Sequence, residues 1–138
     1  MREIKFKAWD AHKRMWTEYR IHDGVVYFLD KSTGVWIGKY DKRYKEFDFM
    51  EYTGLKDKNN KEIYEGDILF ENLGERYYKV IFENGSFKAE FEGDFEDHSF
   101  DLIDVVVQGC EIVGNIYENP ELMEGEQMIK KYIKNLYK

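Results

Sequence analysis

Hydrophobic and polar residues alternate along the first fifty positions of the chain. At its start, Ile4, Phe6 and Ala8 alternate with charged residues, and this period of two is typical of a half-buried β-strand. The pattern predicts a series of short strands and no helix in this part of the chain, because Asp, Gly and Ser residues typical of turns separate further apolar runs. These runs cover residues 14–19, 24–30, 34–40 and 45–52.

A hairpin centred on Asn84 and Gly85 is the clearest local signal further along. An Asn-Gly pair takes positive φ at both turn positions and so matches the twist of the flanking strands, which here are residues 77–83 and 86–92. The later β-branched run, residues 105–117, contains two glycines. Glycines inside a strand predict one that bends or bulges.

The hydrophobic period changes at the C-terminus. Apolar residues recur in pairs four positions apart, with lysines on the other side, which predicts an amphipathic helix of about three turns. Just before it, Asn119 and Pro120 favour the start of a short helical turn. The apolar stripe consists of Met128, Ile129, Tyr132, Ile133, Leu136 and Tyr137.

Three roles are open for this terminal helix: packing on the core of its own chain, pairing with another subunit, or lying on a membrane surface. An isolated helix this short is marginal in water, and its narrow stripe suits a partner helix. The stripe lacks tryptophan and the rest of the chain is acidic, which argues against the membrane.

Composition bounds the class of protein. The chain has 138 residues, about one domain, and its 17% aromatic residues and one proline exclude a disordered or low-complexity chain. Cys110 is the only cysteine, which excludes an internal disulfide framework and a zinc site built on paired cysteines. No signal peptide and no apolar run of about 18 residues occur, so we expect a cytoplasmic protein.

The charge is distributed unevenly. Residues 1–62 hold 14 Lys and Arg against 11 Asp and Glu, residues 63–127 hold 3 against 17, and residues 128–138 hold 4 against none. The acidic block repels nucleic acid and suits a basic partner, a metal cation or a basic segment of a neighbouring copy. The alternative is that the acidic block serves solubility alone.

Two groups of residues are candidates for chemistry or binding. A run rich in acids, Asp94, Asp97, His98 and Asp101, has ligands for a divalent cation, although its spacing fits no EF-hand or two-histidine motif. The basic and aromatic residues of the first lobe form a possible stacking surface for nucleic acid, or else a solvated face over a core. These are Lys5, Lys7, Lys13, Arg14, Lys39, Lys42, Arg43 and Lys45 with Trp9, Trp16, Trp36 and Tyr40.

The segment 51–70, EYTGLKDKNNKEIYEGDILF, combines turn residues with closely spaced charges. Thr53-Gly54 and residues 58–61 are predicted turns, with Asn59 and Asn60 at left-handed positions. Its apolar residues are predicted inward anchors. Four charged residues between these anchors are predicted to be exposed and to form a rigid binding surface: Lys56, Asp57, Lys58 and Glu65.

Together these motifs resemble the YopX family of phage and prophage proteins. The resemblance rests on MREIKFKAWD at residues 1–10, YTGLKDK at 52–58, IYEGD at 63–67 and GNIYENP at 114–120. It implies a small phage-encoded protein of unknown function that assembles into homo-oligomers. It brings no catalytic residues.

The sequence as a whole predicts a mainly β (α+β) protein. We expect a single YopX-like domain over residues 1–138, with lobes at 1–50 (a β region), 51–119 (a small curved sheet or partly open Src-homology-3-like barrel) and 120–138 (the helix). We predict a non-enzymatic protein that needs no metal or cofactor. It acts by binding to other copies of itself and to a host or phage protein.

Alternatives are a nucleic-acid-binding module, an acidic mimic of nucleic acid formed by residues 63–127, or a metal-dependent hydrolase at the acidic run.

Overall fold

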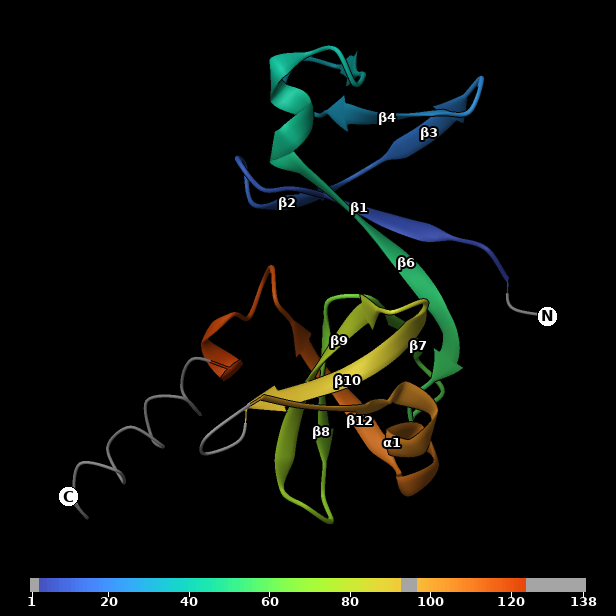
Figure 1. Ribbon diagram of the computed structural model, residues 1–138. Helices are drawn as coiled ribbons and strands as arrows, with labels where there is room; N and C mark the ends of the chain where they lie inside the picture. The colour runs from blue at the N-terminus through green and yellow to red at the C-terminus, as the bar shows by residue number, and fades with distance from the viewer. Residues whose placement is uncertain (1–2, 93–96, 124–138) are drawn as a thin grey trace. The chain divides into compact units, whose positions relative to one another are not determined.

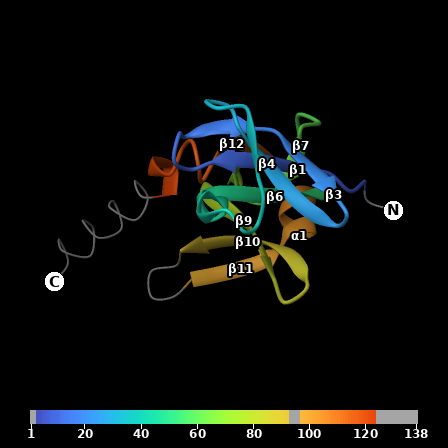
Figure 2. The same ribbon diagram turned by 90° about the horizontal axis from the view of Figure 1, so that it is seen from above.

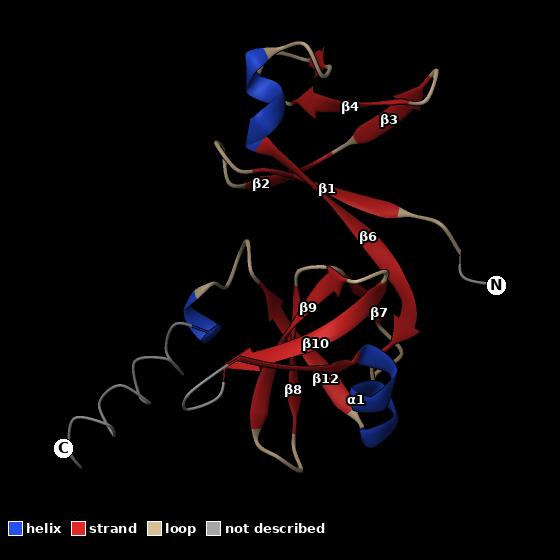
Figure 3. Cartoon of the chain, in the orientation of Figure 1, coloured by secondary structure: helices blue, strands red, loops and turns tan. Residues whose placement is uncertain are grey.

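The computed structural model describes residues 3–92 and 97–123 and is built mainly of β-strands (Figures 1 and 3). The chain divides into two compact units, and the division falls between Tyr52 and Thr53. The predicted lobe boundary at residue 50 lies beside it. The expected mainly β fold is confirmed, and no helix among the described residues is long and apolar enough to cross a membrane.

The first unit contains two antiparallel sheets. In one, β1 lies between β2 and β6, with Ala8 opposite both Thr17 and Phe49. In the other, β4 lies between β3 and β5. The elements of this unit are β1 (Phe6–Asp10), β2 (Met15–Thr17), β3 (Tyr19–His22), β4 (Val25–Asp30), β5 (Val35–Ile37), a 3-10 helix η1 (Lys42–Glu46) and the first part of β6 (Phe47–Lys56).

Alternation along these strands produces the core of the first unit. Phe28 is buried, and its ring stacks on Phe47 at a centroid distance of 5.1 Å. The predicted strands are all present, although run 14–19 divides into β2 and β3. The predicted turn at residues 41–44 instead leads into η1, because the Asp41 carboxylate accepts a hydrogen bond from the Arg43 N–H and caps that helix.

The second unit is a curled half-barrel sheet with strand order β11-β10-β9-β8-β12. Figure 2 shows β10 and β11 of this sheet side by side. Its core contains Ile63, Leu69, Tyr78 and Val80. Its elements after the end of β6 are β7 (Glu62–Tyr64), which extends the β6 sheet, β8 (Asp67–Glu71), β9 (Arg76–Glu83), β10 (Ser86–Glu92), β11 (Asp97–Asp101), α1 (Leu102–Gln108) and β12 (Cys110–Asn115).

The predicted hairpin is confirmed in this sheet. Glu83 pairs with Ser86, and Asn84 and Gly85 between them have φ of 52° and 82°. The predicted bulge is also present, because the register of β12 against β8 shifts between Ile112 and Gly114. These local signals were strong because each requires a backbone conformation that few residues adopt.

Two predictions for this unit were wrong. Residues 105–108 belong to helix α1 rather than to the predicted strand, because Leu102 and Val105, three positions apart, are buried in the core and this packing outweighs the β propensity of the valines. Thr53 and Gly54 lie inside β6 rather than in a turn. There the Thr53 hydroxyl donates a 2.7 Å hydrogen bond to the Ile63 carbonyl and ties β6 to the segment that follows.

A helical turn begins at the end of the described chain, as predicted. The N–H groups of Leu122 and Met123 donate to the carbonyls of Asn119 and Pro120. The Asn119 side chain accepts from the Asn115 N–H instead of capping that turn. The predicted terminal helix, with Met128, Ile129, Tyr132, Ile133, Leu136 and Tyr137, lies outside the described residues.

Candidate functional site

The turn between β6 and β7 is organised by Asp57. This carboxylate is 6% exposed and accepts three main-chain hydrogen bonds of 2.9 Å, from the N–H groups of Asn59, Lys61 and Ile112. The first two bonds close the turn on itself, and the third fixes it to β12. The segment 56–61, which we call the lysine turn, is therefore a rigid part of the second unit.

The main chain of the lysine turn is fully engaged. The N–H groups of Asp57 and Asn60 donate to carbonyls within the turn, and that of Lys58 donates to the Cys110 carbonyl. Since the amides of Asn59 and Lys61 bond to Asp57, no N–H between residues 57 and 61 is left for an anion. The turn is thus not a phosphate-binding nest of amides.

What the lysine turn presents is positive charge. Lys56, Lys58 and Lys61 are all exposed, and Lys58 lies 3.8 Å from a carboxylate oxygen of Glu111. The Asn59 side chain donates to that same carboxylate. The result is a group of three cations on a fixed stretch of main chain, in a unit whose other charged residues are mainly acidic.

The pKa of Asp57 reflects its position. Burial alone raises the pKa of this carboxyl, but the hydrogen bonds from Ile112, Lys61 and Asn59 outweigh burial and hold the pKa below its ordinary value. Asp57 therefore stays ionised near neutral pH. Its negative charge is stabilised by main-chain hydrogen bonds inside the protein.

Three details of the predicted binding surface are corrected. Asp57 is buried rather than exposed, because its carboxylate oxygens accept hydrogen bonds from main-chain N–H groups. Glu65 is only half-buried. Asn60 has φ of 64° and is left-handed as predicted, whereas Asn59 does not have positive φ. A binding role for Lys56, Lys58 and Glu65 stays a prediction.

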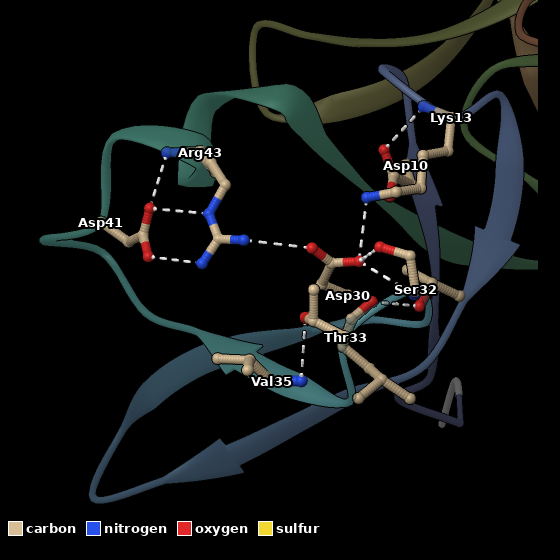
Figure 4. A network of polar contacts seen from close by, with 10 residues as sticks. Asp10, Lys13, Asp30, Ser32, Thr33, Val35, Asp41 and Arg43 are labelled. Atoms are coloured by element: carbon tan, nitrogen blue, oxygen red, sulfur yellow. Dashed lines mark hydrogen bonds and ion pairs between the residues drawn. The ribbon is translucent and has the colours of Figure 1, made fainter.

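A second polar network lies in the first unit, around the buried carboxylate of Asp30 (Figure 4). Lys13 Nζ donates to it at 2.9 Å and Arg43 Nη1 at 3.1 Å, and Ser32 donates through its hydroxyl and its N–H. The hydrogen bond from Lys13 contributes most to holding the pKa of Asp30 well below its ordinary range. The network joins the ends of β1 and β4 to η1.

The residues of the predicted stacking surface in the first lobe have different roles in the structure. Trp9 is a core residue, and half-buried Trp16 packs against it edge to face. Lys13 and Arg43 form ion pairs with Asp30. Trp36 is half-buried, and Tyr40 is 92% exposed. The remaining basic residues, Lys5, Lys7, Arg14, Lys39, Lys42 and Lys45, are exposed except Lys5, which is half-buried.

The acidic run lies partly outside the described residues, since Asp94 is not among them. Asp97, His98 and Asp101 belong to β11. The ring of His98 stacks on Phe91, and Asp101 pairs with Lys88 at 2.6 Å. Residues 3–92 and 97–123 contain no group of three or more His, Cys, Asp or Glu that is arranged to hold a metal.

Cys110 is a buried thiol in the core of the second unit. Burial raises its pKa to about 11, and the nearby charges of Asp57 and Glu71 act in the same direction. The thiol is therefore protonated at neutral pH. A protonated, buried thiol is a poor nucleophile, so its role is packing.

Sequence reasoning missed Asp57 as the organiser of the lysine turn. The available signal was the order of residues, because an Asp followed two positions later by a small polar residue favours a turn in which the carboxylate accepts the later N–H. It also missed Arg20, whose guanidinium carbon lies 4.5 Å from the centre of the Trp36 ring, and Tyr27, which lines a pocket with Tyr40. That proximity depends on strand register and is not visible in the order of residues.

Comparison with known proteins agrees with this fold. The family model described as YopX protein matches residues 5–124. A crystal structure of protein EF1440 from Enterococcus faecalis is 25% identical, with a TM-score of 0.60, and the match covers 89% of this chain and 99% of that one.

A crystal structure of protein yopX from Bacillus subtilis is 20% identical, with a TM-score of 0.50 and coverage of 88% and 98%. No curated protein matches the sequence. The family match spans most of the 138 residues and includes both units. The chain belongs to the YopX protein family.

Proposed function

We propose that this protein is a non-enzymatic binding protein of a phage or prophage, which acts in the bacterial cytoplasm as a homo-oligomer and binds a host or phage protein. The observation that carries the proposal is the lysine turn. A buried carboxylate fixes the main chain that carries three exposed lysines. Ordering a surface before it binds lowers the entropic cost of association.

The use of its reactive groups supports a binding role over catalysis. The carboxylates of Asp57 and Asp30 are saturated by hydrogen bonds from their own unit. Cys110 is buried and protonated. In each case the side chain stabilises the fold, and catalytic groups instead need access to a substrate.

Charge distribution supports self-association. The lysine turn lies on a chain whose residues 63–127 hold 17 acidic residues against 3 basic ones. A cationic turn on one copy and acidic residues on another attract each other and fix their register. Contact between such unlike surfaces gives a closed ring where the rotation permits it.

The partner is tested by affinity capture. Tagged protein is incubated with lysate of a prophage-bearing bacterium, with and without nuclease treatment. It is used as the wild type and with Lys56, Lys58 and Lys61 replaced by alanine. The matched control replaces Lys39, Lys42 and Lys45, three exposed lysines of the first unit. Both variants lose the same charge.

We expect the wild type and the control variant to capture the same protein. The lysine-turn variant should fail to capture it. Equal capture by both variants contradicts the assignment to the lysine turn. Loss of all capture after nuclease treatment contradicts a protein partner.

A further inference from the structure

One face of the three-stranded sheet in the first unit carries aromatic and apolar side chains that its core does not use. Opposite residues in a sheet share a face, and Arg20 lies opposite Tyr27 while Leu29 lies opposite Trp36. Phe28 and Ile37 are buried on the other face. We call the first set, with Val25, the Trp36 face; its apolar members are half-buried and Arg20 is exposed.

Two cations lie against aromatic rings in this region. The guanidinium carbon of Arg20 is 4.5 Å from the centre of the Trp36 ring, and Lys39 Nζ is 5.1 Å from the centre of the Tyr40 ring. Both distances are within the usual range for cation–π contacts. Positive charge and flat rings are thus presented together.

Tyr27 and Tyr40 line one pocket next to this face, together with Val25, Gly38, Lys39 and Asp41. Gly38 lets the Tyr27 ring lie close to the main chain at the wall of this pocket, because a Cβ at this position would lie 2.8 Å from Tyr27 Cε1. The pocket measures about 250 Å³, below the roughly 300–1,000 Å³ of usual small-molecule sites. Its size suits a single planar ring rather than a complete cofactor.

The exposed charges of the segment that carries this face favour an anion. Between residues 18 and 46, the exposed acids are Glu18 and Asp23, and Asp41 is engaged by Arg43. The exposed bases outnumber them, and they are Arg20, Lys31, Lys39, Lys42 and Lys45. Of the two remaining acids in this range, Asp30 is buried and pairs with Lys13 and Arg43, and Glu46 is half-buried.

We propose that the Trp36 face and its pocket bind single-stranded nucleic acid. Bases stack on Trp36 and on the tyrosines of the pocket, while Arg20 and Lys39 contact phosphates. In a duplex the bases are already stacked and paired, so a single strand fits these rings better. An acidic peptide shares the charge but has no flat ring at each residue.

The test is a fluorescence anisotropy titration of the full chain with labelled oligo(dT) and oligo(U). Because the whole chain has a net charge of −7, titrations begin near 50 mM salt and are repeated near 200 mM. Polyglutamate of similar length tests for charge alone. The variants are Tyr40→Ala and Lys39→Ala, and the control is Phe82→Ala, an exposed aromatic residue of the second unit.

We expect both oligonucleotides to bind, with affinity that falls as salt rises and that Tyr40→Ala lowers at least about fivefold. Lys39→Ala also weakens binding, whereas Phe82→Ala does not. The proposal is overturned if no oligonucleotide binds near 50 mM salt, if polyglutamate binds equally well, or if Phe82→Ala weakens binding as much as Tyr40→Ala does. The lysine-turn variant should bind oligonucleotides normally, which separates this site from the protein-binding turn.

Discussion

Single buried carboxylates decide the local geometry of both units. Asp57 closes the lysine turn and holds it to β12, and Asp30 gathers Lys13, Ser32 and Arg43. Sequence alone suggested that Asp57 is exposed, because lysines and asparagines surround it. Its burial depends on Ile112, which is 55 residues away in the chain and adjacent in space.

Asp57→Ala should destabilise the protein. Three main-chain N–H groups lose their acceptor together, so we expect a loss of about 2–4 kcal/mol in the free energy of unfolding, measured by urea denaturation. Lys58→Ala is the neighbouring control, because an exposed ion pair contributes little. Its effect should stay within about 0.5 kcal/mol, and equal losses in the two variants would show that Asp57 does not organise the turn.

The contribution of Asp57 should also depend on pH. Its pKa is lower in the folded chain than the ordinary 3.8, so its stabilisation is complete above that value and is lost as pH falls further. The difference in unfolding free energy between the wild type and Asp57→Ala should therefore be constant from pH 7 to about pH 5 and shrink toward pH 3. A difference that grows on acidification would mean that the pKa of Asp57 is raised.

Strands and hairpins were visible in the sequence at the scale of elements, but α1 was not. Period-two alternation predicted the strands of the first unit, and Asn84-Gly85 predicted the β9–β10 hairpin. The valines of residues 105–107 pointed to a strand. They form a helix because the second unit buries one side of it, a requirement that no local pattern expresses.

A pair of valines on α1 tests this account of the helix. Val105 is 3% exposed and Val107 is 78% exposed, so the same truncation has a different cost at each position. Val105→Ala should lower the free energy of unfolding by about 2 kcal/mol through lost apolar burial and a cavity. Thermal or urea unfolding should show little change for Val107→Ala. Similar losses at both positions would contradict the burial pattern of α1.

Charge is the main feature of the whole molecule. The sequence showed the acidic block and its basic neighbours, since counting charge needs no structure. It did not show that the main chain carrying Lys56, Lys58 and Lys61 is fixed, because that depends on contacts with β12. The division inside β6 also required the structure, because the alternation continues through that strand.

The central claim is that the lysine turn is a binding surface through which copies of the chain associate. Sedimentation equilibrium of the wild type and of the triple alanine variant at Lys56, Lys58 and Lys61 tests it, at about 50 and 500 mM salt. We expect a multiple of the 16.7 kDa chain mass for the wild type at low salt. High salt or the variant should shift the mass toward that of one chain. A wild type of 16.7 kDa under all conditions, or a variant that associates as the wild type does, would contradict the claim.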